Sequence, residues 1–226
     1  MLPSSAVVHG MLVESTLLSS TFRMDDVSGP FGRPLFSTPP CRGPASPLSI
    51  QADALAAGSH LRPLSAPFEA FQFDFSNPPL DGTYVRRLSV PATAAGTVHA
   101  VVYWWTLTLA PGVTLTTAPA VGVGNRRSGG WRDHWMQVAC CLPTPSAVNA
   151  GDAVDIAAVH DDFSIWFAAG GDEARATEPP GCTCGQHLTM MRARIAALHD
   201  PAAHWAPTLA ALAPLGATCA RSFYLN

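Results

Sequence analysis

The chain has 226 residues, of which 48% are hydrophobic and 13% are charged, and its formal net charge at pH 7 is −3. A length and apolar content of this order support one or two packed domains and exclude a chain that is disordered throughout. The slight negative charge argues against a basic nucleic-acid-binding face, and no apolar run reaches the roughly 20 residues of a membrane helix.

The N-terminal residues do not match a secretory leader, because no basic region precedes the apolar run and Glu14 interrupts it. Six cysteines at irregular spacing do not form the pattern of a disulfide framework. We therefore expect a reduced, intracellular protein, located in the cytoplasm, the nucleus or both.

In chain order, the first predicted element is a strand over residues 6–18, where apolar and polar residues roughly alternate. We therefore expect no nucleotide-binding half before this strand. Residues 22–50 are rich in proline and glycine, which is typical of an extended, turn-rich excursion. Their apolar side chains allow two interpretations, a loop that packs on its own domain or an arm that contacts a partner. The residues alone favour the loop.

Strand patterns dominate the middle of the chain. Phe71, Phe73 and Phe75 alternate with polar residues, and residues 97–109 carry apolar side chains on both faces, which predicts a strand buried on both sides. Further strands are predicted at residues 84–90, 113–117, 135–142, 153–160 and 163–168. Short strands separated by turns predict a mainly β fold, an antiparallel barrel or sandwich.

The pattern changes after Gly170. Residues 170–188 resemble a loop, and residues 189–213 place apolar side chains at helical spacing, interrupted by Pro201 and Pro207. Two short helices fit this segment, because proline disfavours helical backbone at the preceding residue. We therefore expect a short α-helical C-terminal extension.

One polar cluster stands out in a chain with few charges, the run Trp131-Arg132-Asp133-His134-Trp135-Met136-Gln137. A glycine-rich stretch precedes it and an apolar strand follows it. A loop that leads into a strand is how a rigid scaffold presents polar groups. On the residues alone, such a run is more often a loop packed by its own indoles.

Soft metal ligands form a second cluster. Cys182, Cys184 and His187 lie within six residues, and Cys219 is a candidate fourth ligand. Three cysteines and one histidine make a standard tetrahedral zinc set, but this spacing is tighter than usual and the pattern alone is weak. Cys140 and Cys141 lie in an apolar strand and are predicted core residues.

His99, His134 and His160 lie on or beside predicted strands and raise a rival hypothesis, a metal oxygenase of the jelly-roll type. That site needs two histidines and a carboxylate that converge inside the barrel. The compact histidine pair with a following glutamate does not occur. His99 lies at the start of a predicted strand and His160 at a turn, where histidines are more often surface or capping groups than metal ligands. Their positions therefore disfavour this hypothesis.

The run at residues 131–137 resembles the Thr-His-Trp loop of the protein arginine methyltransferases, and the aspartate at position 133 resembles their type III, two-module branch. Residues 115–119 resemble the Leu-Ser-Thr-x-Pro segment before this loop. The same likeness extends to the segments 41–44, 71–76, 101–105, 160–166 and 182–187.

The resemblance implies a domain organisation. Residues 1–169 would form the substrate-binding β-barrel, with a dimerisation arm at residues 22–50, which now favours the arm over the packed loop. Residues 170–188 would be a junction with a zinc knuckle, held by Cys182, Cys184, His187 and Cys219. Residues 189–226 would begin a second Rossmann-like module.

The resemblance also implies an activity, the transfer of a methyl group from S-adenosylmethionine to arginine side chains of proteins such as histones. Asp133, His134 and Trp135 would bind the substrate arginine, with His134 as the catalytic residue. The family's cofactor-binding half and double-glutamate loop have no counterpart here, and Met1–Ser4 resemble the residues just after that loop. We therefore expect no S-adenosylmethionine site and no activity of the chain alone, with a homodimer or the second module as partner. The alternative is a non-catalytic interaction module with a zinc knuckle.

Overall fold

A computed structural model describes residues 3–22, 48–78, 82–121, 136–162 and 164–170. These residues form ten strands and two helices. The elements are β1 (Ser5–Glu14), α1 (Thr16–Phe22), β2 (Leu48–Ile50), α2 (Ala52–Ala57), β3 (Arg62–Pro63), β4 (Phe68–Asp74), β5 (Tyr84–Pro91), β6 (Gly96–Ala110), β7 (Val113–Thr116), β8 (Gln137–Val148), β9 (Ala153–His160) and β10 (Ile165–Ala169).

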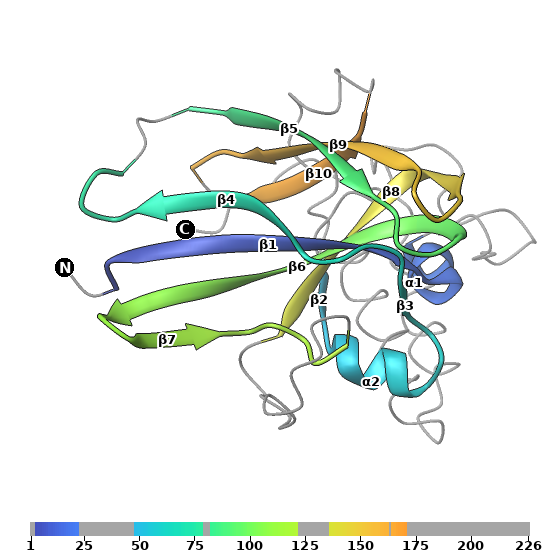
Figure 1. The fold of residues 1–226 in the computed structure, drawn as a ribbon, viewed down its shortest axis with the longest axis horizontal. Coiled ribbons are helices and arrows are strands. Elements are labelled where there is room, and N and C mark those ends of the chain that lie inside the picture. The colour runs from blue at the N-terminus through green and yellow to red at the C-terminus, as the bar shows by residue number, and fades with distance from the viewer. Residues whose placement is uncertain (1–2, 23–47, 79–81, 122–135, 163, 171–226) are drawn as a thin grey trace, which may run out of the picture.

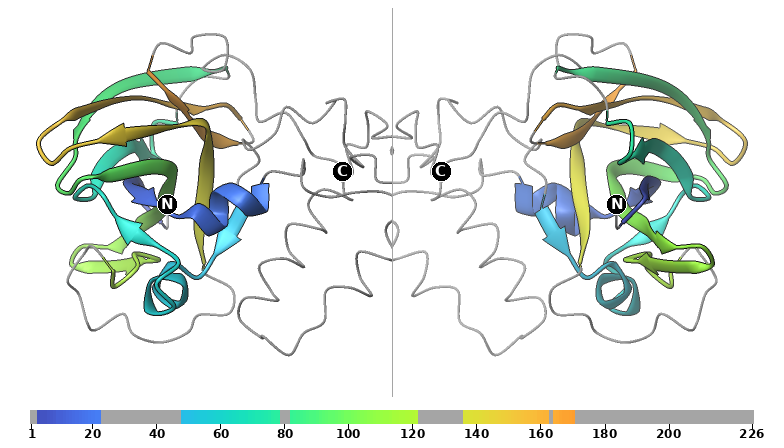
Figure 2. Two further views of the ribbon diagram at one scale, coloured as in Figure 1. Left: turned by 90° about the vertical axis from the view of Figure 1, so that its right-hand side faces the viewer. Right: turned by 90° about the vertical axis from the view of Figure 1, so that its left-hand side faces the viewer.

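The strands form two antiparallel sheets. The larger has the order β2-β8-β6-β1-β3, with β4 also paired to β1 and β7 to β6, and the smaller has the order β10-β9-β5. Figure 1 places α2 on the opposite side of the large sheet from β5, β9 and β10. Seen end-on in Figure 2, the two sheets curl toward each other. The predicted mainly β, antiparallel, barrel-like fold is confirmed.

Side-chain bonds to backbone join the two sheets. On one side, the Tyr103 hydroxyl donates to the Ile165 carbonyl oxygen at 3.1 Å, and the Cys140 thiol contacts the backbone of Phe167. On the other side, Arg86 of β5 donates to the Ala70 carbonyl oxygen of β4 at 3.2 Å. These side-chain bonds, together with a backbone bridge between Ser65 and Ala92, hold the two sheets together.

β6 separates two apolar cores. Val101 and Tyr103 face a cluster between the two sheets, whereas Val102 and Trp104 face a second cluster with Leu55 of α2. Residues 98–104 are buried, while the remainder of β6 up to Ala110 is half-buried. Burial on both faces is thus confirmed for the first half of this strand and is wrong for its second half.

The first strand ends earlier than its pattern predicts, at Glu14 instead of residue 18. The Ser15 hydroxyl oxygen accepts the Leu18 N–H at 3.1 Å, which is the geometry of a helix N-cap. The Ser15 backbone N–H donates to Nδ1 of His99, and the Ser15 hydroxyl donates to the His60 carbonyl oxygen at 2.6 Å. These bonds stop the strand and begin α1, which alternation alone does not reveal.

Other elements also differ from their predicted bounds. β8 continues to Val148, although Pro143 and Pro145 argue against a strand there. The ladder with β6 jumps from Cys141 opposite Ala100 to Ser146 opposite Val98, so this irregularity accommodates both prolines. The last predicted strand is shifted slightly, to Ile165–Ala169. α1, β2, α2 and β3 were not predicted.

Three predictions lie wholly or largely outside the described residues: the arm at 22–50, apart from Phe22 and β2, the junction at 170–188, apart from Gly170, and the second module at 189–226. They stay predictions.

Among the described helices, none is both long and apolar enough to cross a membrane.

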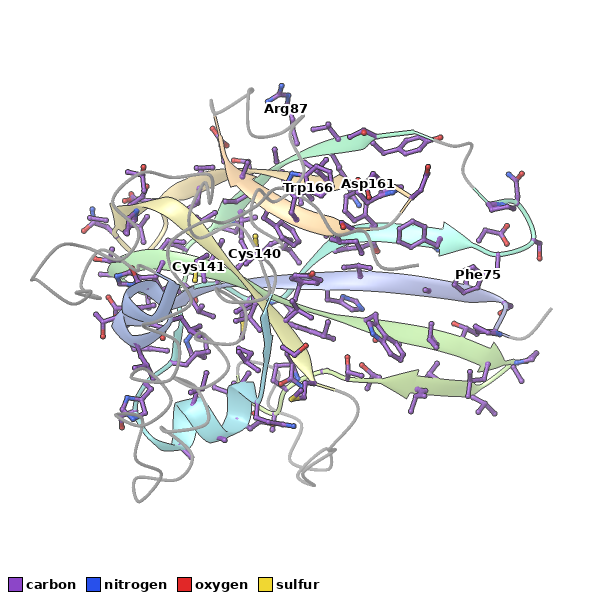
Figure 3. All side chains as sticks on the ribbon, turned by 180° about the vertical axis from the view of Figure 1, so that it is seen from behind. Phe75, Arg87, Cys140, Cys141, Asp161 and Trp166 are labelled. Atoms are coloured by element: carbon purple, nitrogen blue, oxygen red, sulfur yellow. The ribbon has the colours of Figure 1, made fainter. Side chains whose placement is uncertain are left out.

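Cys140 and Cys141 occupy opposite faces of β8, one in each core, as predicted for core residues (Figure 3). Burial raises the pKa of the Cys140 thiol to about 11. Burial and the neighbouring Cys140 raise the pKa of Cys141 well above its usual range. Because the thiolate is the reactive species, both side chains should be inert in the folded protein.

We predict that iodoacetamide at about pH 8 leaves the peptide with Cys140 and Cys141 unlabelled in the native protein and labels it fully in denaturant. Mass spectrometry of tryptic peptides measures this residue by residue. Rapid labelling of either thiol under native conditions would contradict the burial described above.

Candidate functional site

The predicted arginine-binding residues Asp133, His134 and Trp135 lie outside the described residues. Both chain segments that lead to them are described, residues 117–121 after β7 and residues 136–137 at the start of β8. The structure therefore defines the base from which the segment 122–135 extends.

Gln137 occupies the centre of this base. Its side chain is 6% exposed, and its amide is bonded at both ends. Nε2 donates to the Thr117 carbonyl oxygen at 2.7 Å, and Oε1 accepts the Ala52 N–H at 3.0 Å. One buried amide thus joins the end of the β7 segment, the start of β8 and the first residue of α2.

Asp53 forms the second attachment. It lies in the first turn of α2, and its two carboxylate oxygens accept the backbone N–H groups of Ala120 at 3.0 Å and Val121 at 2.8 Å. The last two described residues before the segment 122–135 are therefore held by one carboxylate.

The base also rests on β6. The Thr117 N–H donates to the Trp105 carbonyl oxygen at 3.1 Å, and the hydroxyls of Thr106 and Thr116 are 2.8 Å apart. The Ala118 N–H donates to the Thr116 hydroxyl oxygen. The Thr117 bond continues the β6–β7 pairing one residue beyond the regular ladder, which ends at the pair Thr106 and Thr116.

His9 lies on β1 of the large sheet, where its register partners are Trp104 on β6 and Glu69 on β4. The imidazole of His9 stacks on the Trp104 indole, with centroids 5.8 Å apart. Burial lowers the pKa of His9, and the Glu69 carboxylate offsets this in part.

The histidines of the rival metal hypothesis have separate surroundings. His160 is 8% exposed and lies among aromatic rings, stacked on Tyr84 with centroids 4.9 Å apart and edge-on to Phe71. His99 is also buried, and its Nδ1 accepts the Ser15 N–H. The predicted surface position is wrong for both, although His99 does act as a cap.

Among the described residues, no group of three or more His, Cys, Asp or Glu side chains is placed to hold a metal ion. The candidate zinc ligands Cys182, Cys184, His187 and Cys219 lie outside it, as does His134. The zinc prediction is therefore untested.

Residues 55–172 match the family model of the arginine methyltransferase oligomerization subdomain, which is more than half of the chain. The chain belongs to the arginine methyltransferase family. The family predicted from the sequence is thereby confirmed, and the run at residues 131–137 lies inside the matched region.

Curated relatives named protein arginine N-methyltransferase 7 match most of the chain. The Danio rerio protein is 29% identical over 206 residues, which cover 88% of this chain and 30% of the relative. The Anopheles gambiae protein is 32% identical over 229 residues, covering 88% and 33%. This chain therefore spans about a third of the length of these relatives.

Among solved structures, the Trypanosoma brucei PRMT1 enzyme-prozyme heterotetrameric complex with AdoHcy aligns with a TM-score of 0.48 and 16% sequence identity. The alignment covers 70% of this chain and 47% of that chain.

The lowered pKa of His9 makes stability depend on pH. Below its usual value of 6.5 the unfolded chain binds a proton that the folded protein still excludes. The free energy of unfolding should therefore fall as the pH drops from 6.5 toward the folded pKa, and His9→Phe should reduce this dependence while keeping a ring on Trp104.

Urea unfolding of wild type and His9→Phe at several pH values between about 7.5 and 5.5 measures the effect. His60→Gln, a change at an exposed histidine, is the control and should keep the wild-type dependence. Equal pH slopes for wild type and His9→Phe would contradict the prediction.

Proposed function

We propose that this chain is the substrate-facing β-barrel part of an S-adenosylmethionine-dependent protein arginine methyltransferase. In this proposal, the run at residues 131–137 forms the barrel-side wall of the pocket for the arginine guanidinium. The family membership and the position of this run within the matched region carry the proposal. The attached base at Gln137 and Asp53 supports it, because a binding loop needs a rigid scaffold.

Methyl transfer to a guanidinium is an in-line displacement that depends chiefly on the position of nucleophile and donor. A cationic arginine is attracted by a carboxylate and by the face of an indole. Asp133 would supply the first and Trp135 the second. His134 would complete the wall and serve as the catalytic residue in the intact enzyme.

S-adenosylmethionine supplies the methyl group in this proposal. None of the residues assigned to a site in this chain is proposed to contact it. The contribution of the chain is therefore to bind and orient the arginine side chain. The proposed substrates are arginine-containing proteins such as histones, which implies a cytoplasmic or nuclear location.

Self-association is part of the proposal. The matched family model describes an oligomerization subdomain, and residues 22–50 were predicted as a dimerisation arm. The proposed partner is a second copy of the chain or a second module of the intact enzyme.

The test of the arginine pocket is peptide binding to the chain itself, measured by NMR titration. We expect a histone-derived arginine peptide to bind more tightly than the same peptide with lysine in place of arginine. Asp133→Asn, His134→Ala and Trp135→Ala should each weaken binding, with about a tenfold loss for Trp135→Ala, because a desolvated cation–π contact contributes about 1–2 kcal/mol.

A parallel assay uses the intact Danio rerio relative. Replacing the residue aligned with His134 by alanine should lower kcat/KM for methyl transfer from labelled S-adenosylmethionine. Unchanged turnover there, together with equal peptide binding by all variants here, would reject the arginine pocket. The non-catalytic interaction module would then be favoured.

We also propose a structural zinc ion held by Cys182, Cys184, His187 and Cys219, on the strength of the ligand types. Metal analysis of the purified chain should find about one zinc ion per chain, and Cys184→Ser should release it. A chelator should lower the melting temperature of the wild type and leave Cys184→Ser unaffected, with Cys140→Ala as a control that retains zinc. Absence of zinc together with indifference to the chelator would refute this.

A further inference from the structure

We propose that Ser89 on β5 is a phosphorylation site for a serine kinase that recognises paired arginines, and that its phosphate weakens the pairing of β5 with β9. Arg86 and Arg87 lie three and two residues before Ser89, and the apolar Val90 follows it directly. A kinase cleft with carboxylates for two guanidinium groups and an apolar subsite would recognise this pattern, because carboxylates bind guanidinium groups through paired hydrogen bonds.

The pattern occurs once in the chain. Two arginines are adjacent only at residues 86–87 and 126–127. The second pair places Gly129 at the corresponding acceptor position, so it offers no hydroxyl there. Ser89 is therefore the single serine or threonine with arginine at both the second and the third preceding position.

The side chains that a kinase would contact are exposed. Arg87 and Ser89 are both exposed on the outer face of the small sheet, whereas Leu88 between them packs against the core between the two sheets. Figure 3 shows Arg87 pointing away from the sheets. The Arg86 side chain is 47% exposed, and its ion pair with Glu69 at 3.3 Å is weak because both partners are in contact with water.

The surroundings of Ser89 have space for a phosphate. Ser89 lines an open pocket of about 330 Å³, and Arg87 and Asp155 line the same pocket. A phosphoryl group on the serine oxygen would extend into this space without displacing the backbone of the sheet. The pocket therefore allows the modified side chain to remain on the outer face.

β5 lies at the edge of the small sheet, where it pairs only with β9. Val90 is 3% exposed, so a kinase that binds this side chain must act while β5 is detached from the core. Local opening at an edge costs less free energy than unfolding of the whole domain. We therefore expect the native chain to be phosphorylated, but more slowly than a free peptide of the same sequence.

The reaction is a phosphoryl transfer from ATP. The Ser89 oxygen forms a bond to the γ-phosphorus, the bond from that phosphorus to the β,γ-bridging oxygen breaks, and ADP leaves. An aspartate of the kinase accepts the proton of the serine hydroxyl. The modified serine then carries a charge of about −1.5 to −2 at pH 7.

This phosphate would meet a negative charge when β5 pairs with β9 again. Asp155 on β9 is the direct register partner of Ser89, and both side chains are exposed. Like charges directly opposite each other in an antiparallel pair are destabilising. Arg87 lies two residues away on the same face and would offset only part of the repulsion, since one positive charge faces a phosphate and a carboxylate. Phosphorylation should therefore favour detachment of β5.

The test treats the full chain with ATP and the catalytic subunit of cyclic-AMP-dependent protein kinase, and mass spectrometry locates the phosphate. A synthetic peptide of residues 83–93 is treated in parallel. The wild type should be phosphorylated at Ser89, and Ser89→Ala should lose this phosphate. Arg86→Gln and Arg87→Gln should each lower kcat/KM of the kinase about tenfold or more, because each removes a charge-assisted contact.

Two controls separate recognition from stability. Ser146→Ala changes an exposed serine of β8 that no nearby arginine precedes, and it should match the wild type. Glu69→Gln breaks the ion pair of Arg86 but keeps both arginines, so it should not lower phosphorylation. Equal losses in Glu69→Gln and Arg86→Gln would mean that Arg86 acts by holding β5, which would contradict its contact with the kinase. If Arg86→Gln does not fold, Arg87→Gln decides.

Hydrogen exchange measures the effect of the phosphate on the strand pair. The backbone amides of β5 and β9 should exchange about two- to fivefold faster in the phosphorylated wild type, as expected for like charges placed opposite each other. Phosphorylated Asp155→Asn should show a smaller increase. The amides of β6 should exchange as in the unmodified chain.

Failure of the kinase to modify Ser89 in the wild-type chain would overturn the proposal, whether or not the peptide is modified. Phosphorylation at Ser89 with unchanged exchange of β5 and β9 would refute the effect on the pairing. An equal increase in wild type and Asp155→Asn would refute the role of Asp155 in it.

Discussion

The backbone pairing of β6 on both of its edges is the constraint on which the rest of the structure depends. β6 pairs with β1 along one edge and with β8 and β7 along the other. Its first half is also buried on both faces, so its backbone N–H and C=O groups have no access to water and must be satisfied by these ladders. Both apolar cores and the register of β1 and β8 follow from this strand.

The candidate site is an extension of the same strand. Beyond the last paired residues of β7, Thr117 still bonds to the backbone of Trp105, and Gln137 then binds Thr117. Gln137, the first residue of β8, is thus connected to β6 through two hydrogen bonds in series.

Local patterns were enough to predict most of the strands, but not the short strands β2 and β3 or the hydrogen bonds around Gln137 and Asp53. The alternation at Phe71 and Phe73 and the two-sided apolar pattern of β6 are properties of neighbouring residues, so sequence alone revealed them. The end of β1 at Ser15 depends on hydrogen bonds to His60 and His99. The N-cap residue of α2, Gln51, makes no side-chain capping bond, and the Ala52 N–H at the start of this helix is bound by Gln137 instead. Such contacts join residues distant in sequence and leave no local periodicity.

The same limit applies within the candidate site. Asp133, His134 and Trp135 were predicted because a run of indole, imidazole and carboxylate is distinctive in a chain with few charges. Gln137 lay in that run, and its only local signal was a polar side chain at the start of an apolar strand. Asp53 had no signal, since a six-residue helix is too short to show an amphipathic pattern. All described anchors belong to the large sheet and α2, whereas Arg86, Tyr103 and Cys140 join that sheet to the smaller one. The contacts between the two sheets and the attachment of residues 117–121 therefore depend on different side chains, which allows the stability of the domain and the geometry of this base to vary separately.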